Sequence, residues 1–180
     1  MDVGLTLKKN TDSKNYILTG YCDSDFAANK EDRRSVTGYF VQVNGSTIAW
    51  KSKKQTSTTL SSTEAEYVTL SYCACELQFL FQLFNELNLP LQKPIIINED
   101  NAGALFIVNN STVGQRTKHI DTRYHFVREL VENNVLRITY VPTGENPADL
   151  FTKNLGNEKH DNFTTIIMNP NAQIAKKGGC

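Results

Sequence analysis

Residues 61–87 contain neither proline nor glycine, and their apolar residues recur at helical spacing, which constrains the fold more than any other segment. These apolar positions follow one another in steps of three and four: Leu70, Cys73, Leu77, Leu80, Phe84 and Leu87. Side chains at such steps share one face of a helix. The pattern predicts one long helix that buries this stripe.

Glu66 continues the same stripe one turn before Leu70, so its carboxylate is expected to point toward the core. Glu64 instead begins a polar line that is expected to face solvent. That line continues through Ser71, Gln78 and Asn85. An ionised carboxylate in a core costs several kcal/mol unless it is paired. Two interpretations stay open: Glu66 caps the helix start, where anions are favoured, or it is a metal ligand or general base.

Three strand-like runs precede the helix, and their short connections predict an antiparallel meander. The runs cover residues 16–25, 36–43 and 47–51. Asn44-Gly45, between the second and third runs, is the strongest short hairpin signal in the chain. Trp50 is expected to pack in the core or against this hairpin rather than to stack on bases.

Further strands and helices alternate after the long helix. Residues 95–100 form a continuous apolar run that ends in acid, which is typical of a strand buried on both faces. A fifth strand is expected at residues 136–141, and helices at residues 101–108, 120–131 and 157–168 and after the N-cap Asn146. Hairpin pairing and right-handed crossovers then place the first strand beside the fourth. The order predicts an α/β domain.

Four acids are expected at one rim of this sheet, where the carboxyl ends of strands form ligand sites. They are Asp23, Glu66, Asp100 and Asp149. Each acid alone has an ordinary interpretation as a turn residue, an N-cap or a first-turn anion. Together they repel one another and demand cations, and carboxylate oxygens suit Mg²⁺ or Mn²⁺. Two such ions ~4 Å apart are the machinery of phosphodiester hydrolysis.

Composition limits which kinds of binding surface, cysteine chemistry and membrane association are expected. The formal net charge is zero, so any nucleic-acid surface has to be local. The cysteines Cys22, Cys73, Cys75 and Cys180 form no metal pattern and are expected to be free thiols. No apolar run is long enough to span a bilayer, and we expect a soluble intracellular protein without a membrane partner.

Five segments carry a family pattern: residues 20–27 (GYCDSDFA), 61–67 (SSTEAEY), 99–102 (EDNA), 118–129 (KHIDTRYHFVRE) and 141–153 (VPTGENPADLFTK). Together they resemble the ribonuclease H domain of Ty1/copia-type retrotransposon polyproteins, over residues 3–163. The resemblance implies a ribonuclease H-like fold with a five-stranded mixed sheet in the order 3-2-1-4-5, flanked by helices. It also implies cleavage of the RNA strand of RNA–DNA hybrids during reverse transcription.

The resemblance assigns both the catalytic and the metal-binding roles to Asp23, Glu66, Asp100 and Asp149. Strand alternation alone cannot separate Asp23 from Asp25, and here the family pattern favours Asp23. Two Mg²⁺ ions are implied, for which Mn²⁺ can substitute. The implied partners are an RNA–DNA hybrid and the reverse transcriptase domain of the same polyprotein. The implied location is the cytoplasmic virus-like particle of the element, or the nucleus.

The hybrid should be bound through its sugar–phosphate backbones and 2′-hydroxyls rather than its base edges. Candidate contacts are Lys51, Lys53, Lys54, Ser62, Arg116, Lys118, His119 and Arg123. For each basic residue, ordinary solvated charge is an equally good interpretation. A zinc site is not expected, because His119 and Asp121 diverge on a helix.

Three expectations concern organisation and alternatives. Residues 1–14 are expected to follow an upstream polymerase region, residues 15–156 to form the ribonuclease H-like domain, and residues 157–180 to be an extension with a flexible tail.

Many members of the wider superfamily carry a histidine in the loop before the last acid. Residues 142–147 contain none, as in copia-type domains, and Thr143 or Glu145 are candidate substitutes. A non-catalytic hybrid-binding tether is the main alternative, and a DNA-cutting relative of the same fold is the third.

Overall fold

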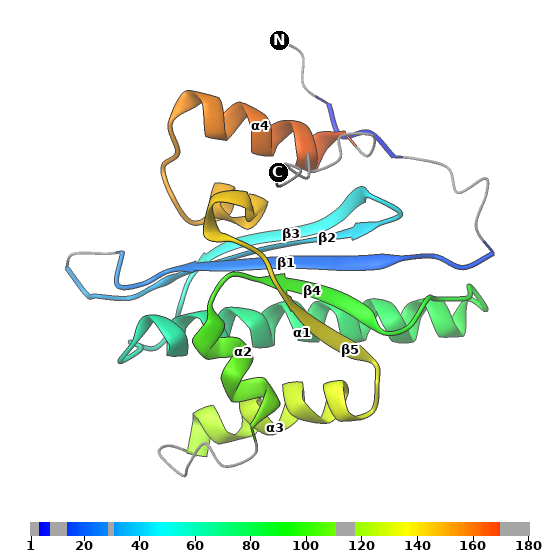
Figure 1. The fold of residues 1–180 in the computed structure, drawn as a ribbon, viewed down its shortest axis with the longest axis horizontal. Helices are drawn as coiled ribbons and strands as arrows, with labels where there is room; N and C mark the ends of the chain where they lie inside the picture. Colours follow the sequence, from blue (N-terminus) through cyan, green and yellow to red (C-terminus); the bar gives the residue numbers. More distant parts are fainter. Residues whose placement is uncertain (1–3, 8–13, 29–30, 111–117, 170–180) are drawn as a thin grey trace, which may run out of the picture.

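The structure is a computed structural model that describes residues 4–7, 14–28, 31–110 and 118–169 (Figure 1). Its centre is a five-stranded sheet in the order β3-β2-β1-β4-β5. The strands are β1 (Leu18–Asp25), β2 (Val36–Val43), β3 (Ser46–Lys54), β4 (Ile95–Glu99) and β5 (Leu136–Tyr140). The first three pair antiparallel, whereas β4 runs parallel to β1 and to β5. The predicted fold class and strand order are confirmed.

Helices cover both faces of the sheet (Figure 1). On one face lie α1 (Ser62–Glu86), α2 (Ala102–Asn109) and α3 (Lys118–Glu132). On the other lie the short 3₁₀ helix η2 (Pro147–Phe151) and α4 (Asn157–Met168), with η1 (Thr143–Glu145) leading into them. No helix in the described part of the chain has the length and apolar character needed to cross a membrane.

The β2–β3 hairpin turns at the predicted dipeptide. Asn44 and Gly45 both have positive φ, 49° and 80°, as a tight hairpin turn of this kind requires. β3 runs three residues beyond the predicted run, because Lys54 still pairs with Val36. Trp50 does not lie in the core, because β3 is an edge strand and Trp50 is 58% exposed; its expected packing against the hairpin stays a prediction.

The start of α1 assigns the capping role to Glu64 rather than Glu66. Ser61 accepts a hydrogen bond from the Glu64 amide at 3.1 Å, and the Glu64 carboxylate accepts one from the Leu60 amide at 2.7 Å. This arrangement satisfies one free amide of the first helical turn, that of Glu64, and the amide of Leu60 just before the N-cap. Glu66 is thus not needed as a cap, and its side chain is buried.

Most of the predicted apolar stripe on α1 is in the core, but one residue of the stripe and one of the predicted solvent-facing line are misplaced. Leu70, Cys73 and Leu77 are fully buried, whereas Leu87 is 58% exposed because it lies at the C-cap, beyond the last helical turn. Ser71, expected to face solvent, is buried because α3 packs on the side of α1 away from the sheet.

A second, smaller core fixes η2 and α4 to the opposite face. Phe40 of β2 packs with Ala148 of η2 and Ile167 of α4, and its ring stacks on that of Tyr21 at 4.8 Å between centroids. The proposed division of the chain at residue 156 stays a prediction. The predicted tail at 170–180 lies outside the described residues.

Candidate metal centre

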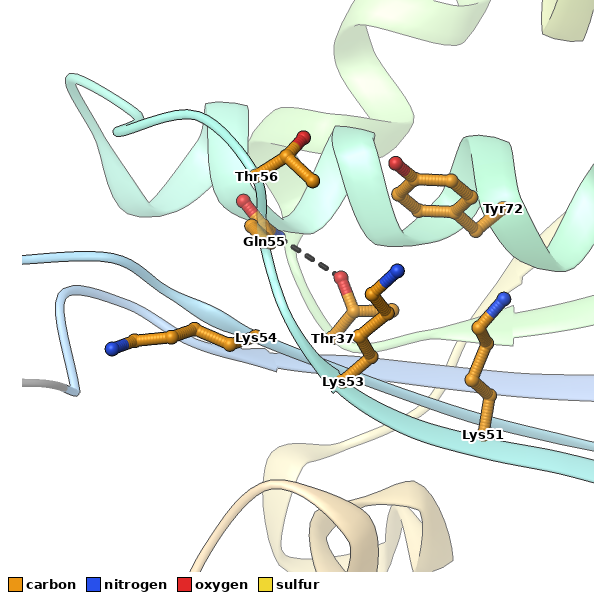
Figure 2. Close-up of a pocket in the computed structure, with 7 residues that line it drawn as sticks. All are labelled: Thr37, Lys51, Lys53, Lys54, Gln55, Thr56 and Tyr72. Atoms are coloured by element: carbon orange, nitrogen blue, oxygen red, sulfur yellow. Dashed lines mark hydrogen bonds between the residues drawn. The ribbon is translucent and has the colours of Figure 1, made fainter.

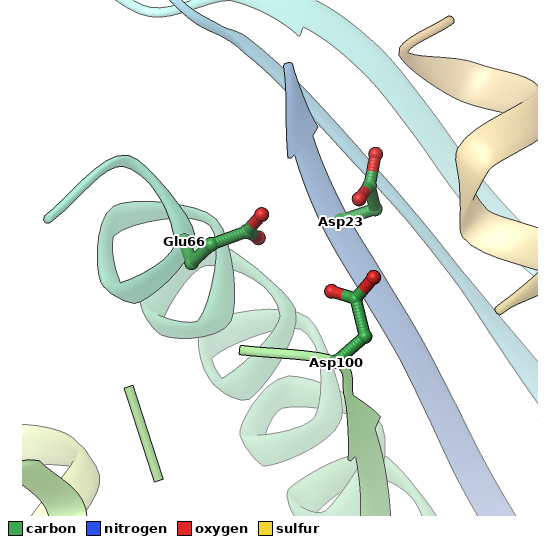
Figure 3. A group of neighbouring side chains, drawn as sticks. All are labelled: Asp23, Glu66 and Asp100. Atoms are coloured by element: carbon green, nitrogen blue, oxygen red, sulfur yellow. The ribbon is translucent and has the colours of Figure 1, made fainter. Parts of the chain in front are cut away.

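Three of the four predicted acids converge at the carboxyl ends of the central strands (Figure 3). Asp23 comes from β1, Glu66 from the second turn of α1, and Asp100 directly follows β4. One carboxylate oxygen of each lies within 4.8 Å of those of the other two. Asp25, on the same strand, is not part of this group. The three carboxylates form a ready set of oxygen ligands.

Two local features bring together the strands and helices that carry these acids. Parallel pairing of β1 with β4 brings the strand ends that carry Asp23 and Asp100 side by side. Gly103, in the first turn of α2, lies so close to α1 that an added Cβ would sit 2.7 Å from the Thr63 hydroxyl. The first turns of α1 and α2 therefore meet at the rim.

Burial makes the group of acids electrostatically costly. Removal from water raises the pKa of Glu66 to about 10, and the neighbouring Glu99, Asp23 and Asp100 add to the shift. Burial also raises the pKa of Asp23 to about 6, against the opposing effects of the Thr152 hydroxyl and the Lys153 ammonium.

The ligand set fits a hard divalent cation. One oxygen of Glu66, Oε2, is buried and has no hydrogen-bond partner among the described residues. A buried carboxylate oxygen without a partner needs either a proton or a cation. An all-carboxylate set of this kind is the donor chemistry of Mg²⁺ and Mn²⁺.

Asp149 reaches the site from the other face of the sheet. Asn146, the N-cap of η2, donates to the Cys22 carbonyl at 2.8 Å and so attaches η2 to β1. Asp149 is buried and accepts from the Lys153 ammonium at 2.6 Å, and Lys153 also contacts Asp23 at 2.9 Å. Asp149 is thus linked to the other acids through Lys153 rather than by direct contact.

The sequence reasoning overlooked four residues around these acids. Thr152 and Lys153 both donate to Asp23, and the Lys159 ammonium lies 2.5 Å from the second Asp149 oxygen. Lys153 had a usable signal, because it lies one helical turn after Asp149 with opposite charge.

Glu99 is the fourth residue, and it points into the core. It is fully buried, accepts from the Cys22 thiol at 3.0 Å and from the Asn101 amide at 3.1 Å, and burial raises its pKa to about 8. Nothing in the sequence separates Glu99 from Asp100 except alternation along β4.

A cationic groove, lined by Thr37, Lys51, Lys53, Lys54, Gln55, Thr56 and Tyr72, lies beside α1 (Figure 2). Lys51 and Lys53 point toward α1, whereas Lys54 points away and pairs with Asp32 at 2.7 Å. The Lys51 ammonium lies 5.8 Å from the centroid of the Tyr72 ring. Arg123 of α3 lies 5.2 Å from the same centroid.

The other predicted contacts are less well placed by the structure. Ser62 is exposed at the first residue of α1. Lys118 and His119 begin α3, but their side chains are not described, and Arg116 lies outside the described residues. Thr143 and Glu145 are both exposed in η1.

Comparison with known proteins gives one consistent group of relatives. The retrovirus-related Pol polyprotein of transposon TNT 1-94 from Nicotiana tabacum is 42% identical over 137 residues, which are 76% of this chain and 10% of the relative. That of transposon RE1 from Arabidopsis thaliana is 39% identical over 165 residues, 91% of this chain and 11% of the relative. The chain therefore spans about a tenth of the length of these relatives. No protein-family model matches the chain.

Solved structures support the fold. LC11-RNase H1 in complex with an RNA/DNA hybrid superposes with a TM-score of 0.52 at 16% identity, covering 75% of this chain and 93% of that one. The foamy viral protease-reverse transcriptase in complex with an RNA/DNA hybrid gives 0.53 at 15% identity, covering 84% of this chain and 22% of that one.

Proposed function

The chain belongs to the Pol polyproteins of Ty1/copia-type retrotransposons and has a ribonuclease H fold, and we propose that it hydrolyses the RNA strand of RNA–DNA hybrids during reverse transcription. The observation that carries this proposal is the convergence of Asp23, Glu66 and Asp100 at one rim, with Asp149 joined to them through Lys153. Two proteins that share the fold, LC11-RNase H1 and the foamy viral enzyme, were solved with RNA/DNA hybrids.

We propose two Mg²⁺ ions as the cofactor, with Mn²⁺ as a substitute. Asp23, Glu66 and Asp100 would hold one ion, and Asp23 with Asp149 the other. When bound, the ions would activate the attacking water and stabilise the leaving 3′ oxygen. The protein itself contributes carboxylates on strand ends and helix starts, of which Asp23, Glu66 and Asp100 already lie close together.

The cationic groove is the surface that fits the substrate. Lys51 and Arg123 lie over the Tyr72 ring and Lys53 lines the same groove, and together they offer ammonium and guanidinium groups to a sugar–phosphate backbone. The groove lies along α1, the helix that carries Glu66, so a duplex bound there reaches the acids. We also propose Ser62, Arg116, Lys118 and His119 as contacts. The reverse transcriptase of the same polyprotein would deliver the hybrid in the cytoplasmic virus-like particle.

The proposal is tested with a labelled RNA–DNA hybrid beside matched all-DNA and all-RNA duplexes, in Mg²⁺, Mn²⁺ or chelator. We expect cleavage of the RNA strand in the hybrid alone, and no cleavage with chelator. Binding of the hybrid without cleavage would favour the tether function instead. Cleavage of the all-DNA duplex would mean a DNA-cutting relative of the same fold.

Asp23 and Asp25 provide a matched pair of variants for the acidic site. Asp23→Asn removes a member of the buried group, whereas Asp25→Asn makes the same change two residues along the same strand and outside the group. We expect Asp23→Asn to lower the rate of hybrid cleavage by at least about a thousandfold, and Asp25→Asn to change it by less than about tenfold. Equal rates for the two variants would refute the assignment.

A further inference from the structure

Lys153 holds a position between two buried carboxylates. Its ammonium is 2.9 Å from Asp23 and 2.6 Å from Asp149, and both acid side chains are only 1% exposed. The Lys153 side chain is 32% exposed, so a path to solvent is open to it. Among the described residues, no other ammonium contacts both acids; Lys159 contacts Asp149 alone.

The ion pairs are strong, because both carboxylates are buried and opposite charges attract more strongly where water is excluded. Burial by itself lowers the pKa of Lys153, but hydrogen bonds and charges from Asp149 and Asp23 outweigh it and raise the pKa, so the amine stays charged. Two buried carboxylates need a positive charge between them, and Lys153 supplies it. Within the described ranges, no lysine or other hydrogen-bond partner contacts the Oε2 atom of Glu66.

We propose that Lys153 takes the place of a divalent cation between Asp23 and Asp149, so that the two metal positions load unequally and in order. A cation held by Asp23, Glu66 and Asp100 meets Lys153 at Asp23 alone, since among the described residues no lysine pairs with Glu66 or Asp100. A cation held by Asp23 and Asp149 must first displace the Lys153 ammonium toward solvent. This inference rests on the proposed function, and it makes Lys153 a positioning residue that sets when the second cation binds.

The test is calorimetric titration of the full chain with Mn²⁺, without nucleic acid. We expect two classes of site in the wild type, of which the weaker belongs to Asp149. Lys153→Gln should tighten the weaker class by about tenfold and leave the tighter class within about threefold. Asp149→Asn should remove the weaker class, and adding Lys153→Gln to it should then change nothing.

Lys93→Gln is the matched control, because it removes the same charge at the opposite end of the sheet, ahead of β4, where Lys93 lies over the Phe81 ring. It should reproduce the wild-type constants. Unchanged or weakened constants in Lys153→Gln would overturn the inference and show that Lys153 is only a structural link. A wild type that binds no Mn²⁺ would instead overturn the proposed metal-dependent function.

A second measurement uses the wild type and so does not depend on a variant that folds. Lysines are acylated with an amine-reactive ester and mapped by mass spectrometry, with and without saturating Mn²⁺. Modification of Lys153 should rise at least about threefold with Mn²⁺, because the displaced amine is no longer held in its ion pairs, whereas modification of Lys93 should not change. Equal modification of Lys153 in both conditions would contradict the displacement.

Discussion

At the scale of single residues, Glu66 shows how a functional position breaks the pattern around it. It lies on the buried face of α1, where the next residues along the same face, Leu70 and Cys73, are apolar. Glu64 meets the requirement of the helix start for a carboxylate, so capping does not explain Glu66. In the metal-free protein, buried Glu66 is costly when it is ionised, because its Oε2 has no hydrogen-bond partner among the described residues, so it requires either a proton or a cation.

The pH dependence of the metal-free protein should reveal that cost. The stability contributed by protonated Glu66 and Glu99 is complete below pH 4.5, the ordinary value for glutamate, and is lost as the pH rises toward about 8 for Glu99 and about 10 for Glu66. In chelator, the unfolding temperature should therefore fall between pH 5 and pH 9. Glu66→Gln should flatten this fall and raise the unfolding temperature at pH 8 by on the order of 5 °C.

Glu64→Gln is the control, since it removes the same charge from the solvent side of the same turn. It should keep the wild-type slope. Scanning calorimetry across the pH range measures both variants, and a steeper fall in Glu66→Gln than in wild type would show that Glu66 is ionised and paired in the metal-free protein.

At the scale of elements, the close approach of η2 to β2 determines how near Asp149 lies to the proposed metal site. Gly38 pairs with Asp23 across the β1–β2 ladder, and an added Cβ would lie 2.5 Å from Thr152 Cγ2 and 2.8 Å from Phe151 Cβ. Only glycine lets η2 lie this close. The same contact brings Thr152 and Lys153 to Asp23.

Gly38→Ala should therefore push η2 away from the sheet. We expect a loss of about 1–3 kcal/mol in unfolding free energy, as for other overpacked sites, and a fall in hybrid cleavage larger than this loss explains. Gly144→Ala is matched, because it lies in η1 of the same connection with nothing within 4 Å of the added Cβ. Denaturant unfolding and cleavage rates measure both variants; wild-type cleavage by Gly38→Ala would separate η2 from catalysis.

Turns and caps could be predicted from the sequence because they depend on adjacent residues. Burial and contacts that depend on packing between distant segments could not. The Asn44-Gly45 turn and the Asn146 cap could be predicted because their conformations are set by adjacent residues. The burial of Ser71 could not, because periodicity does not show that α3 covers a second side of α1. The contact of Lys153 with Asp23 could not be predicted, because it joins residues 130 positions apart, although the spacing of Lys153 from Asp149 was visible.

At the scale of the whole molecule, buried hydrogen bonds join the wall of the cationic groove to the helix turn that carries Glu66. Gln55, on the groove wall, donates to the Ala65 carbonyl at 3.1 Å, one residue before Glu66. It also donates to Thr37, whose hydroxyl contacts Thr69 of α1 at 3.0 Å. These buried hydrogen bonds fix the end of β3 to the helix turn that carries Glu66. The positive charge of the groove is local, because the whole chain has a formal net charge of zero.

The proposed binding of the hybrid along the groove predicts how salt should affect its affinity. Lys51 and Lys53 point into the groove, so replacing both with Gln should weaken hybrid binding by on the order of tenfold near 0.1 M salt and reduce the slope of log K against log salt by about two. Lys54 points away and pairs with Asp32, and Lys93 lies at the other end of the sheet. The double variant Lys54→Gln with Lys93→Gln removes the same charge and should change the slope by less than about one. Binding is measured by fluorescence anisotropy with Ca²⁺ in place of Mg²⁺ across a salt series. Equal slopes for the two double variants would place the hybrid away from the groove, because a general loss of positive charge would then account for the whole effect.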